Sequence, residues 1–165
     1  MRLENKVAII TGGSRGIGFA TAERFIAEGA AVAVCASKQE NADRAVGQLK
    51  EIHPDAKLIG ICPNLADMES VKESFAKVID EFGRIDILVN NAGISESTPF
   101  ANYTEELYDK VMDLNMKGVF NATHVAVENM KERGEGVILS TSSMVSISGQ
   151  PGGFAYPASK FALNG

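Results

Sequence analysis

Tyr156 and Lys160 lie four residues apart in the stretch YPASK, and together they could exchange a proton with an oxygen atom. A phenol alone ionises too weakly near neutral pH to be an efficient acid or base. On a helix, residues four positions apart share one face, so the Lys160 ammonium would lie near the phenol and stabilise its phenolate. Pro157 is typical of the first helical position, which would place Tyr156 at the positive end of the helix dipole. The pair predicts an acid–base centre for an alcohol or a carbonyl.

The stretch TGGSRGIG, residues 11–18, is typical of a loop that binds phosphate groups. Gly12 permits a tight turn, Gly16 lets the backbone approach a pyrophosphate, and Gly18 allows the following helix to pack closely on the strand. The N-terminus of that helix offers N–H groups and a positive dipole end. Glycines alone are weak evidence, but their position between a strand and a helix favours a dinucleotide site. The loop residues expected to contact the cofactor are Gly12, Ser14, Arg15, Gly16, Ile17 and Gly18.

The elements that must position these residues follow from hydrophobic periodicity. The expected strands are Lys6–Thr11, Ala31–Ala36, Lys57–Cys62, Asp86–Asn90 and Gly136–Ser142. The expected helices are Ile17–Glu28, Gln39–Ile52, Met68–Phe82 and a long one from Thr104, a good N-cap, to about Lys131. Apolar strands that alternate with helices indicate a parallel sheet covered on both faces. Right-handed crossovers then give a doubly wound, Rossmann-like α/β fold, with residues 1–165 as a single domain.

Several motifs in order along the chain carry a family resemblance. The TGxxxGxG spacing of the glycine loop, NNAG at residues 90–93 and YxxxK at residues 156–160 resemble the short-chain dehydrogenase/reductase family. Ser143, thirteen residues before Tyr156, matches the position of the family's catalytic serine, and Asn115 in LNMKG matches the asparagine of its long helix. Alone, YxxxK would more often be a packed tyrosine beside a surface lysine. The motifs together span essentially the whole chain.

The resemblance implies a role for each matching residue. Tyr156 and Lys160 would exchange the proton and contact the cofactor, and Ser143 would hydrogen-bond the substrate oxygen, with Ser142 as its main rival. Asn115 would hold a water linked to Lys160. Small residues after the fourth strand would flank the cofactor, and these are Asn91, Ala92 and Gly93.

The residues after the second strand bear on the choice of cofactor. NAD-binding folds place an acid there for the ribose hydroxyl, whereas this chain has Ser37 and Lys38. A hydroxyl and an ammonium suit a 2′-phosphate, and Arg15 could reach the same group. We therefore expect NADP(H), with NAD(H) as the alternative if Arg15 and Lys38 are merely solvated charges. Asn64 and Leu65 are expected at the adenine, although many relatives carry Asp where Asn64 stands.

Composition excludes several other classes of protein. The net charge of -5 leaves no basic stripe for a nucleic acid, and no apolar run approaches a membrane span. Cys35 and Cys62 lie singly in apolar segments and are interpreted as buried small hydrophobes, and no export signal opens the chain, so we expect a cytoplasmic protein. His53 and His124 stand alone, without metal-like spacing, so no metal is expected.

The sequence predicts an oxidoreductase that transfers a hydride between a nicotinamide cofactor and a ketone or secondary alcohol. The glycine-loop sequence IITGGSRGIGFA and the stretches CPNLAD and FAYPASK resemble those of bacterial hydroxysteroid dehydrogenases. The overall order of the motifs is equally similar to that of 3-oxoacyl-acyl-carrier-protein reductases. The alternative is an inactive cofactor-binding fold or a non-catalytic fragment of such an enzyme. Family members continue past residue 165, so we expect a fragment that lacks the last strands and leaves one sheet edge open. The resemblance implies a homodimer or homotetramer for the full-length protein.

Overall fold

The burial pattern of the first strand shows how the sheet is covered. The computed structural model describes all 165 residues, and its first strand, β1, comprises Val7–Ile10 and is buried throughout. Val7 and Ile9 belong to one apolar cluster, whereas Ala8 and Ile10 belong to a second. Since successive side chains of a strand point to opposite faces, β1 must lie between two layers of helices.

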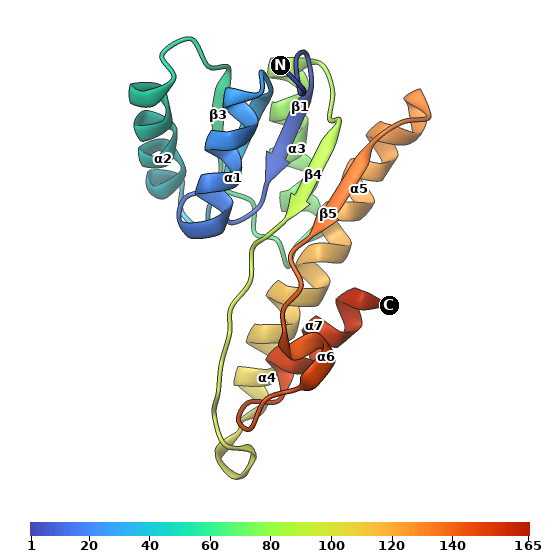
Figure 1. Ribbon diagram of the computed structural model, residues 1–165. Coiled ribbons are helices and arrows are strands. Elements are labelled where there is room, and N and C mark those ends of the chain that lie inside the picture. Colours follow the sequence, from blue (N-terminus) through green and yellow to red (C-terminus); the bar gives the residue numbers. More distant parts are fainter.

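All five strands run parallel, in the order β3-β2-β1-β4-β5 (Figure 1). The other four are β2 (Ala31–Cys35), β3 (Leu58–Ile61), β4 (Ile87–Asn90) and β5 (Val137–Ser140). Every predicted strand is present, though each is slightly shorter than predicted. The order reverses at β1, because the chain builds outward to β3 and then returns to β4 on the other side. Doubly wound folds bind ligands at this switch point, outside the carboxyl ends of the strands.

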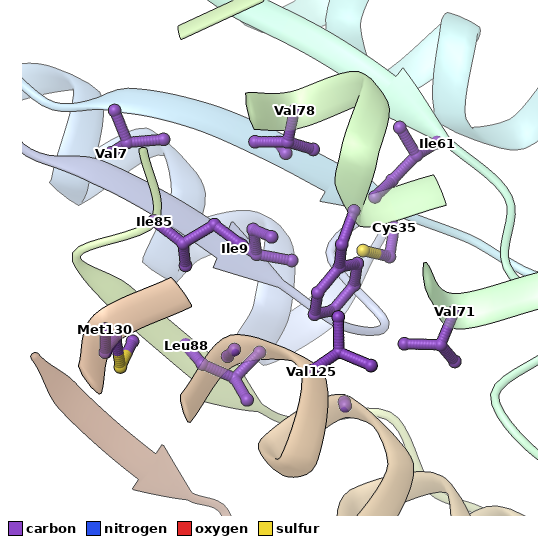
Figure 2. Close-up of a cluster of buried hydrophobic side chains, with 14 of the residues drawn as sticks. Val7, Ile9, Cys35, Ile61, Val71, Val78, Ile85, Leu88, Val125 and Met130 are labelled. Atoms are coloured by element: carbon purple, nitrogen blue, oxygen red, sulfur yellow. The ribbon is translucent and has the colours of Figure 1, made fainter. Parts of the chain in front are cut away.

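Two pairs of helices cover the two faces of the sheet. The helices α1 (Gly16–Ala27) and α2 (Gln39–Ile52) contribute Ala22, Ile26, Ala45 and Leu49 to one cluster. The helices α3 (Met68–Phe82) and α5 (Gly118–Arg133) contribute Val71, Phe75, Val125 and Met130 to the other, part of which is drawn in Figure 2. The predicted bounds of α2 and α3 are confirmed, and α1 begins and ends one residue earlier than predicted. The predicted fold class is confirmed.

The long predicted helix is present but is not regular. It consists of α4 (Glu105–Met112), a π-helical turn η2 (Asp113–Lys117) and α5. It begins at the predicted N-cap Thr104, whose hydroxyl accepts a hydrogen bond from the Leu107 N–H at 3.2 Å. It ends at Gly134, which has the left-handed conformation common after helices.

The π turn shifts which residues of the long helix face inward. Leu107, Val111, Leu114 and Phe120 are apolar residues spaced along the long helix. Val111 is buried and Leu107 and Leu114 are half-buried, but Phe120 is 62% exposed and stacks on His124. A π turn adds a residue and rotates everything after it about the helix axis, and Phe120 lies outside the face that Leu107, Val111 and Leu114 share.

Three short elements lie beyond the carboxyl ends of the strands, beside α4 (Figure 1). They are the 3-10 turn η1 (Phe100–Asn102), α6 (Val145–Ser148) and α7 (Ala155–Asn164). At the sheet edge, β5 leaves Val137, Ile138 and Leu139 exposed, which confirms the expected open edge. None of the helices combines the length and apolar character needed to cross a bilayer.

The two cysteines are both free, but their surroundings differ. Cys35 is buried in β2, and burial raises the pKa of its thiol, as expected of an inert core residue. Cys62 is only half-buried, so its interpretation as a buried residue is wrong. It lies directly past the end of β3.

Two residues of α2 test which face carries the stability of the fold. Leu49 is fully buried, whereas Ile52, three residues later, is 53% exposed. We expect Leu49→Ala to lower the free energy of unfolding by about 2–5 kcal/mol and Ile52→Ala to change it by no more than about 0.5 kcal/mol. Urea denaturation measures both, and equal losses would contradict the described packing.

Candidate active site at the carboxyl ends of the strands

The glycine loop packs directly on the segment that follows β4. Gly12 has a φ of +64°, and a Cβ built there would lie 2.9 Å from the Ala92 Cα. A Cβ at Gly18 would overlap the carbonyl oxygen of Gly12. Both predicted reasons for glycine, a tight turn and a close packing contact, therefore apply at these positions. Gly13, buried beneath the loop, was not predicted, and its N–H donates to the Cys35 carbonyl at 2.9 Å.

Side chains of Thr11 and Asn91 fasten this loop to the end of β4. The Thr11 hydroxyl accepts hydrogen bonds from the N–H groups of Asn91 and Ala92, both at 3.0 Å. The Asn91 amide donates to the carbonyls of Thr11 and Gly12 at 3.1 and 3.2 Å. The Asn91 side chain therefore shapes the loop, and Ala92 and the exposed Gly93 complete the segment. Thr11 was not predicted to matter, although it opens the TGxxxGxG motif.

The N-terminus of α1 is free of side-chain caps. Arg15 is the N-cap residue, and its side chain makes no capping hydrogen bond. Gly16 has a φ of +56° with no atom within 4 Å of a Cβ built there, and Ile17 is 70% exposed. Ser14, half-buried, precedes them in the loop. Helix N-terminal N–H groups without protein partners are suited to bind an anion such as a phosphate.

The residues after β2 and β3 give a mixed result for the adenosine end of a dinucleotide. Ser37 and Lys38 are exposed beyond β2, with no acid between them and the strand. The Asn64 side chain accepts a hydrogen bond from the Ala66 N–H at 3.2 Å and so shapes its own turn. The Leu65 side chain is buried in the core and its carbonyl accepts from the Asn121 amide at 2.8 Å, so the side chain is not available to a ligand.

Tyr156 and Lys160 lie in α7, with Tyr156 in its first turn. Lys160 Nζ lies 5.9 Å from the centre of the Tyr156 ring and donates to the Thr141 carbonyl at 2.6 Å. Lys160 is only 6% exposed, and burial lowers the pKa of its ammonium. Pro157 is the third helical residue, not the first as predicted, because α7 already begins at Ala155. The first turn still tolerates it, since N–H groups there have no partner within the helix.

The hydroxyls of the two candidate serines are used differently. The Ser142 hydroxyl donates to the Asn164 side chain at 2.8 Å, at the far end of α7. The Ser143 hydroxyl only accepts a long hydrogen bond of 3.4 Å from the Val145 N–H, so its proton is free to donate. This difference favours Ser143 over Ser142 as the residue that contacts a substrate oxygen.

Asn115 is buried at the centre of the π turn and joins three parts of the site. Its side-chain oxygen accepts from the Ile94 N–H at 3.0 Å, and its amide group donates to the Ile94 carbonyl at 2.9 Å. The same amide group donates to the Ser159 hydroxyl at 3.1 Å, and Ser159 in turn donates to the Tyr156 carbonyl at 2.7 Å. Ser159, which is fully buried, was not predicted. The only feature of the sequence that could have indicated Ser159 is its position directly before Lys160.

The comparisons with known proteins agree with this arrangement. Residues 6–165 match the short chain dehydrogenase family. This chain belongs to that family. It is 58% identical over 165 residues to a 3alpha-hydroxysteroid dehydrogenase of Mediterraneibacter gnavus and 41% identical to a 3-oxoacyl-acyl-carrier-protein reductase of Thermotoga maritima. In both cases all of this chain aligns with 66% of the relative, so the chain spans just under two thirds of their length.

A solved structure, that of levodione reductase, is similar throughout. The TM-score is 0.93 at 32% identity, and the match covers 98% of this chain and 63% of the reductase. Short chain dehydrogenases bind a nicotinamide cofactor, and the glycine loop of this chain fits one. The uncapped helix N-terminus and the open space at Gly16 are where a pyrophosphate would be held. No group of three or more His, Cys, Asp or Glu side chains is gathered as a metal would require.

A pair of glycine substitutions tests the loop. In Gly12→Ala the added Cβ meets the Ala92 backbone at a φ of +64°, so we expect affinity for the cofactor to fall by at least about tenfold. Gly47→Ala is the control, because nothing lies within 4 Å of a Cβ at this position in α2. It should leave cofactor binding unchanged and raise stability by about 0.4–1 kcal/mol. Fluorescence titration with NADPH and urea denaturation measure the two effects, and normal NADPH binding by Gly12→Ala would contradict the assignment.

Proposed function

We propose that this protein is an NADP(H)-dependent oxidoreductase that interconverts a ketone and a secondary alcohol. The observation that carries the proposal is the buried Lys160 beside Tyr156, beyond the same strand ends as the glycine loop. The bound nicotinamide supplies or accepts the hydride. The chain itself supplies the proton and the groups that orient the carbonyl.

Tyr156 gives its phenolic proton to the carbonyl oxygen during reduction and takes a proton back during oxidation. The Lys160 ammonium stabilises the phenolate that results. The Thr141 carbonyl fixes the position of this ammonium by accepting its hydrogen bond. Ser143 donates its free hydroxyl proton to the same substrate oxygen, where negative charge develops. Asn115 completes the proton path by holding a water linked to Lys160.

Three polar residues support NADP(H) over NAD(H). Ser37, Lys38 and Arg15 are all exposed at the carboxyl ends of β1 and β2, where a ribose 2′-phosphate would lie. The region lacks the carboxylate that would select the 2′-hydroxyl of NAD(H). Asn64 and the backbone of Leu65 border the adenine in this arrangement.

Exposed apolar side chains near Ser143 and Tyr156 support an apolar ketone as the substrate. Met144 is 75% exposed, Ile147 is 72% exposed and Phe154 is 45% exposed. A steroid ketone offers apolar surface to such residues, and the 58% identical relative is a hydroxysteroid dehydrogenase. The 3-oxoacyl thioester is the second candidate, supported by the 41% identical reductase.

We further propose a cytoplasmic homodimer or homotetramer that pairs through α5, where Phe120 is 62% exposed.

Removal of one oxygen tests the proton donor. We expect Tyr156→Phe to lower kcat for a steroid ketone by about 10²–10⁴-fold, with NADPH affinity little changed, because general acid–base catalysis contributes that much. Tyr108→Phe is the matched control, since Tyr108 is 38% exposed and its ring lies 6.1 Å from that of Phe154. Rates on a steroid ketone and a 3-oxoacyl thioester rank the two substrates. NADPH binding without turnover of either would instead favour a non-catalytic binding protein.

A charge substitution tests cofactor selection. Lys38→Ala should reduce the preference for NADPH over NADH by roughly 10- to 100-fold, as expected for loss of one charge-assisted hydrogen bond to phosphate. Lys50→Ala removes the same charge from the far end of α2 and should leave the preference unchanged. The measurement is kcat/KM with each cofactor. Equal or better efficiency of the wild type with NADH would overturn the assignment.

A further inference from the structure

The helix that carries Tyr156 and Lys160 has no local N-cap. Phe154 is the N-cap residue of α7, and it offers no side-chain oxygen to the helix. Helices normally begin at Ser, Thr, Asp or Asn, because the first N–H groups have no partner within the helix. A catalytic helix that begins at phenylalanine therefore needs acceptors from elsewhere in the chain.

Glu96 and Tyr103 supply those acceptors from a distant part of the sequence. One carboxylate oxygen of Glu96 accepts from the Phe154 N–H at 2.9 Å and from the Tyr156 N–H at 3.3 Å. The Ala155 N–H donates to the Tyr103 hydroxyl oxygen at 3.2 Å. Residue 157, which follows Tyr156, is a proline and has no N–H. Every donor at the start of α7 is thus accounted for.

Glu96 is itself held firmly in place. Its second carboxylate oxygen accepts from the Thr98 N–H at 3.1 Å, and its backbone carbonyl accepts from the Gln150 amide at 3.0 Å. Burial alone would raise the pKa of Glu96, but the hydrogen bonds from Phe154, Tyr103, Tyr156 and Thr98 outweigh it and lower the pKa. The carboxylate is therefore ionised in the acceptor form that the cap requires.

The segment around Glu96 and the start of α7 lie close together in addition to sharing these hydrogen bonds. Gly153, directly before Phe154, has a φ of +83°, and a Cβ there would lie 2.6 Å from the Glu96 carbonyl oxygen. Its N–H donates to the Thr98 carbonyl at 2.9 Å. Two residues before Glu96, Ile94 is held by Asn115 through both of its backbone groups. The strap of residues 94–98 thus joins the π turn to the start of α7.

We propose that Glu96 is a positioning residue, a long-range N-cap that fixes the first turn of α7 and with it the Tyr156 side chain. This assignment rests on the proposed function in one respect, that Tyr156 is the proton donor. Glu96 does not contact the reacting atoms in this scheme. It acts through the backbone of Tyr156, one residue of the turn that it caps.

Hydrogen exchange of single amides in the whole chain tests the cap without any substrate. In Glu96→Ala we expect the amides of Phe154 and Tyr156 to exchange on the order of tenfold faster, the change that corresponds to about 1.4 kcal/mol for a lost charge-assisted hydrogen bond. Glu96→Gln keeps a carbonyl oxygen as acceptor and should restore most of the protection. Glu105→Ala is the control, because Glu105 is an exposed glutamate of α4 without side-chain hydrogen bonds in the chain. Unchanged exchange at residues 154 and 156 in Glu96→Ala would overturn the proposal.

Steady-state kinetics then test whether the cap positions the tyrosine. We expect Glu96→Ala to lower kcat for the ketone about tenfold with an unchanged KM for NADPH, and Glu96→Gln to recover most of that loss. Because a loss of folded enzyme would also lower the apparent kcat at unchanged KM, kcat is expressed per NADPH-binding site counted by titration. Faster exchange with an unchanged kcat would overturn the positioning role. If the wild type turns over no ketone, the proposed function fails, and the exchange data alone decide whether the cap exists.

Discussion

The buried amide of Asn115 is the interaction on which the site depends. It satisfies both backbone groups of Ile94 and also donates to Ser159, which holds the Tyr156 carbonyl. The segment after β4, the long helix and α7 have no sheet hydrogen bonds to one another, and this side chain in the long helix contacts both of the other two. A buried polar group left without partners costs about 1–3 kcal/mol, which makes an alternative arrangement of the three segments unfavourable. The π turn places the amide where all three can reach it.

A second set of polar contacts fixes the cofactor side of the site. Thr11 and Asn91 bind the glycine loop to the end of β4, and Asn91 also lies within 3.5 Å of the Thr141 hydroxyl. The Thr141 carbonyl holds Lys160 in turn. The glycine loop and the acid–base pair are therefore connected through two strand ends, so a displacement of either strand would disturb both parts.

The sequence was sufficient to predict the fold, and the predicted site residues remain a prediction that their positions at the strand ends support. The continuous apolar run of β1 and the amphipathic pattern of α2 and α3 are local signals, and the structure matches them. The π turn and the roles of Thr11 and Ser159 were missed, because they depend on partners many residues away. Leu65 was assigned to the adenine by analogy, whereas its side chain is in the core. The Glu96 contacts span 58 and 60 residues, and no periodicity or motif records such a pairing.

The central claim is that this chain's own groups complete a hydride transfer to a ketone. The most direct measurement uses NADPH that carries deuterium at the transferable position, a steroid ketone and mass spectrometry of the product. The account predicts an alcohol with deuterium on the carbinol carbon, formed by the wild type and not by a variant without the Tyr156 hydroxyl. Tight binding of NADPH with no labelled alcohol from any ketone would contradict it.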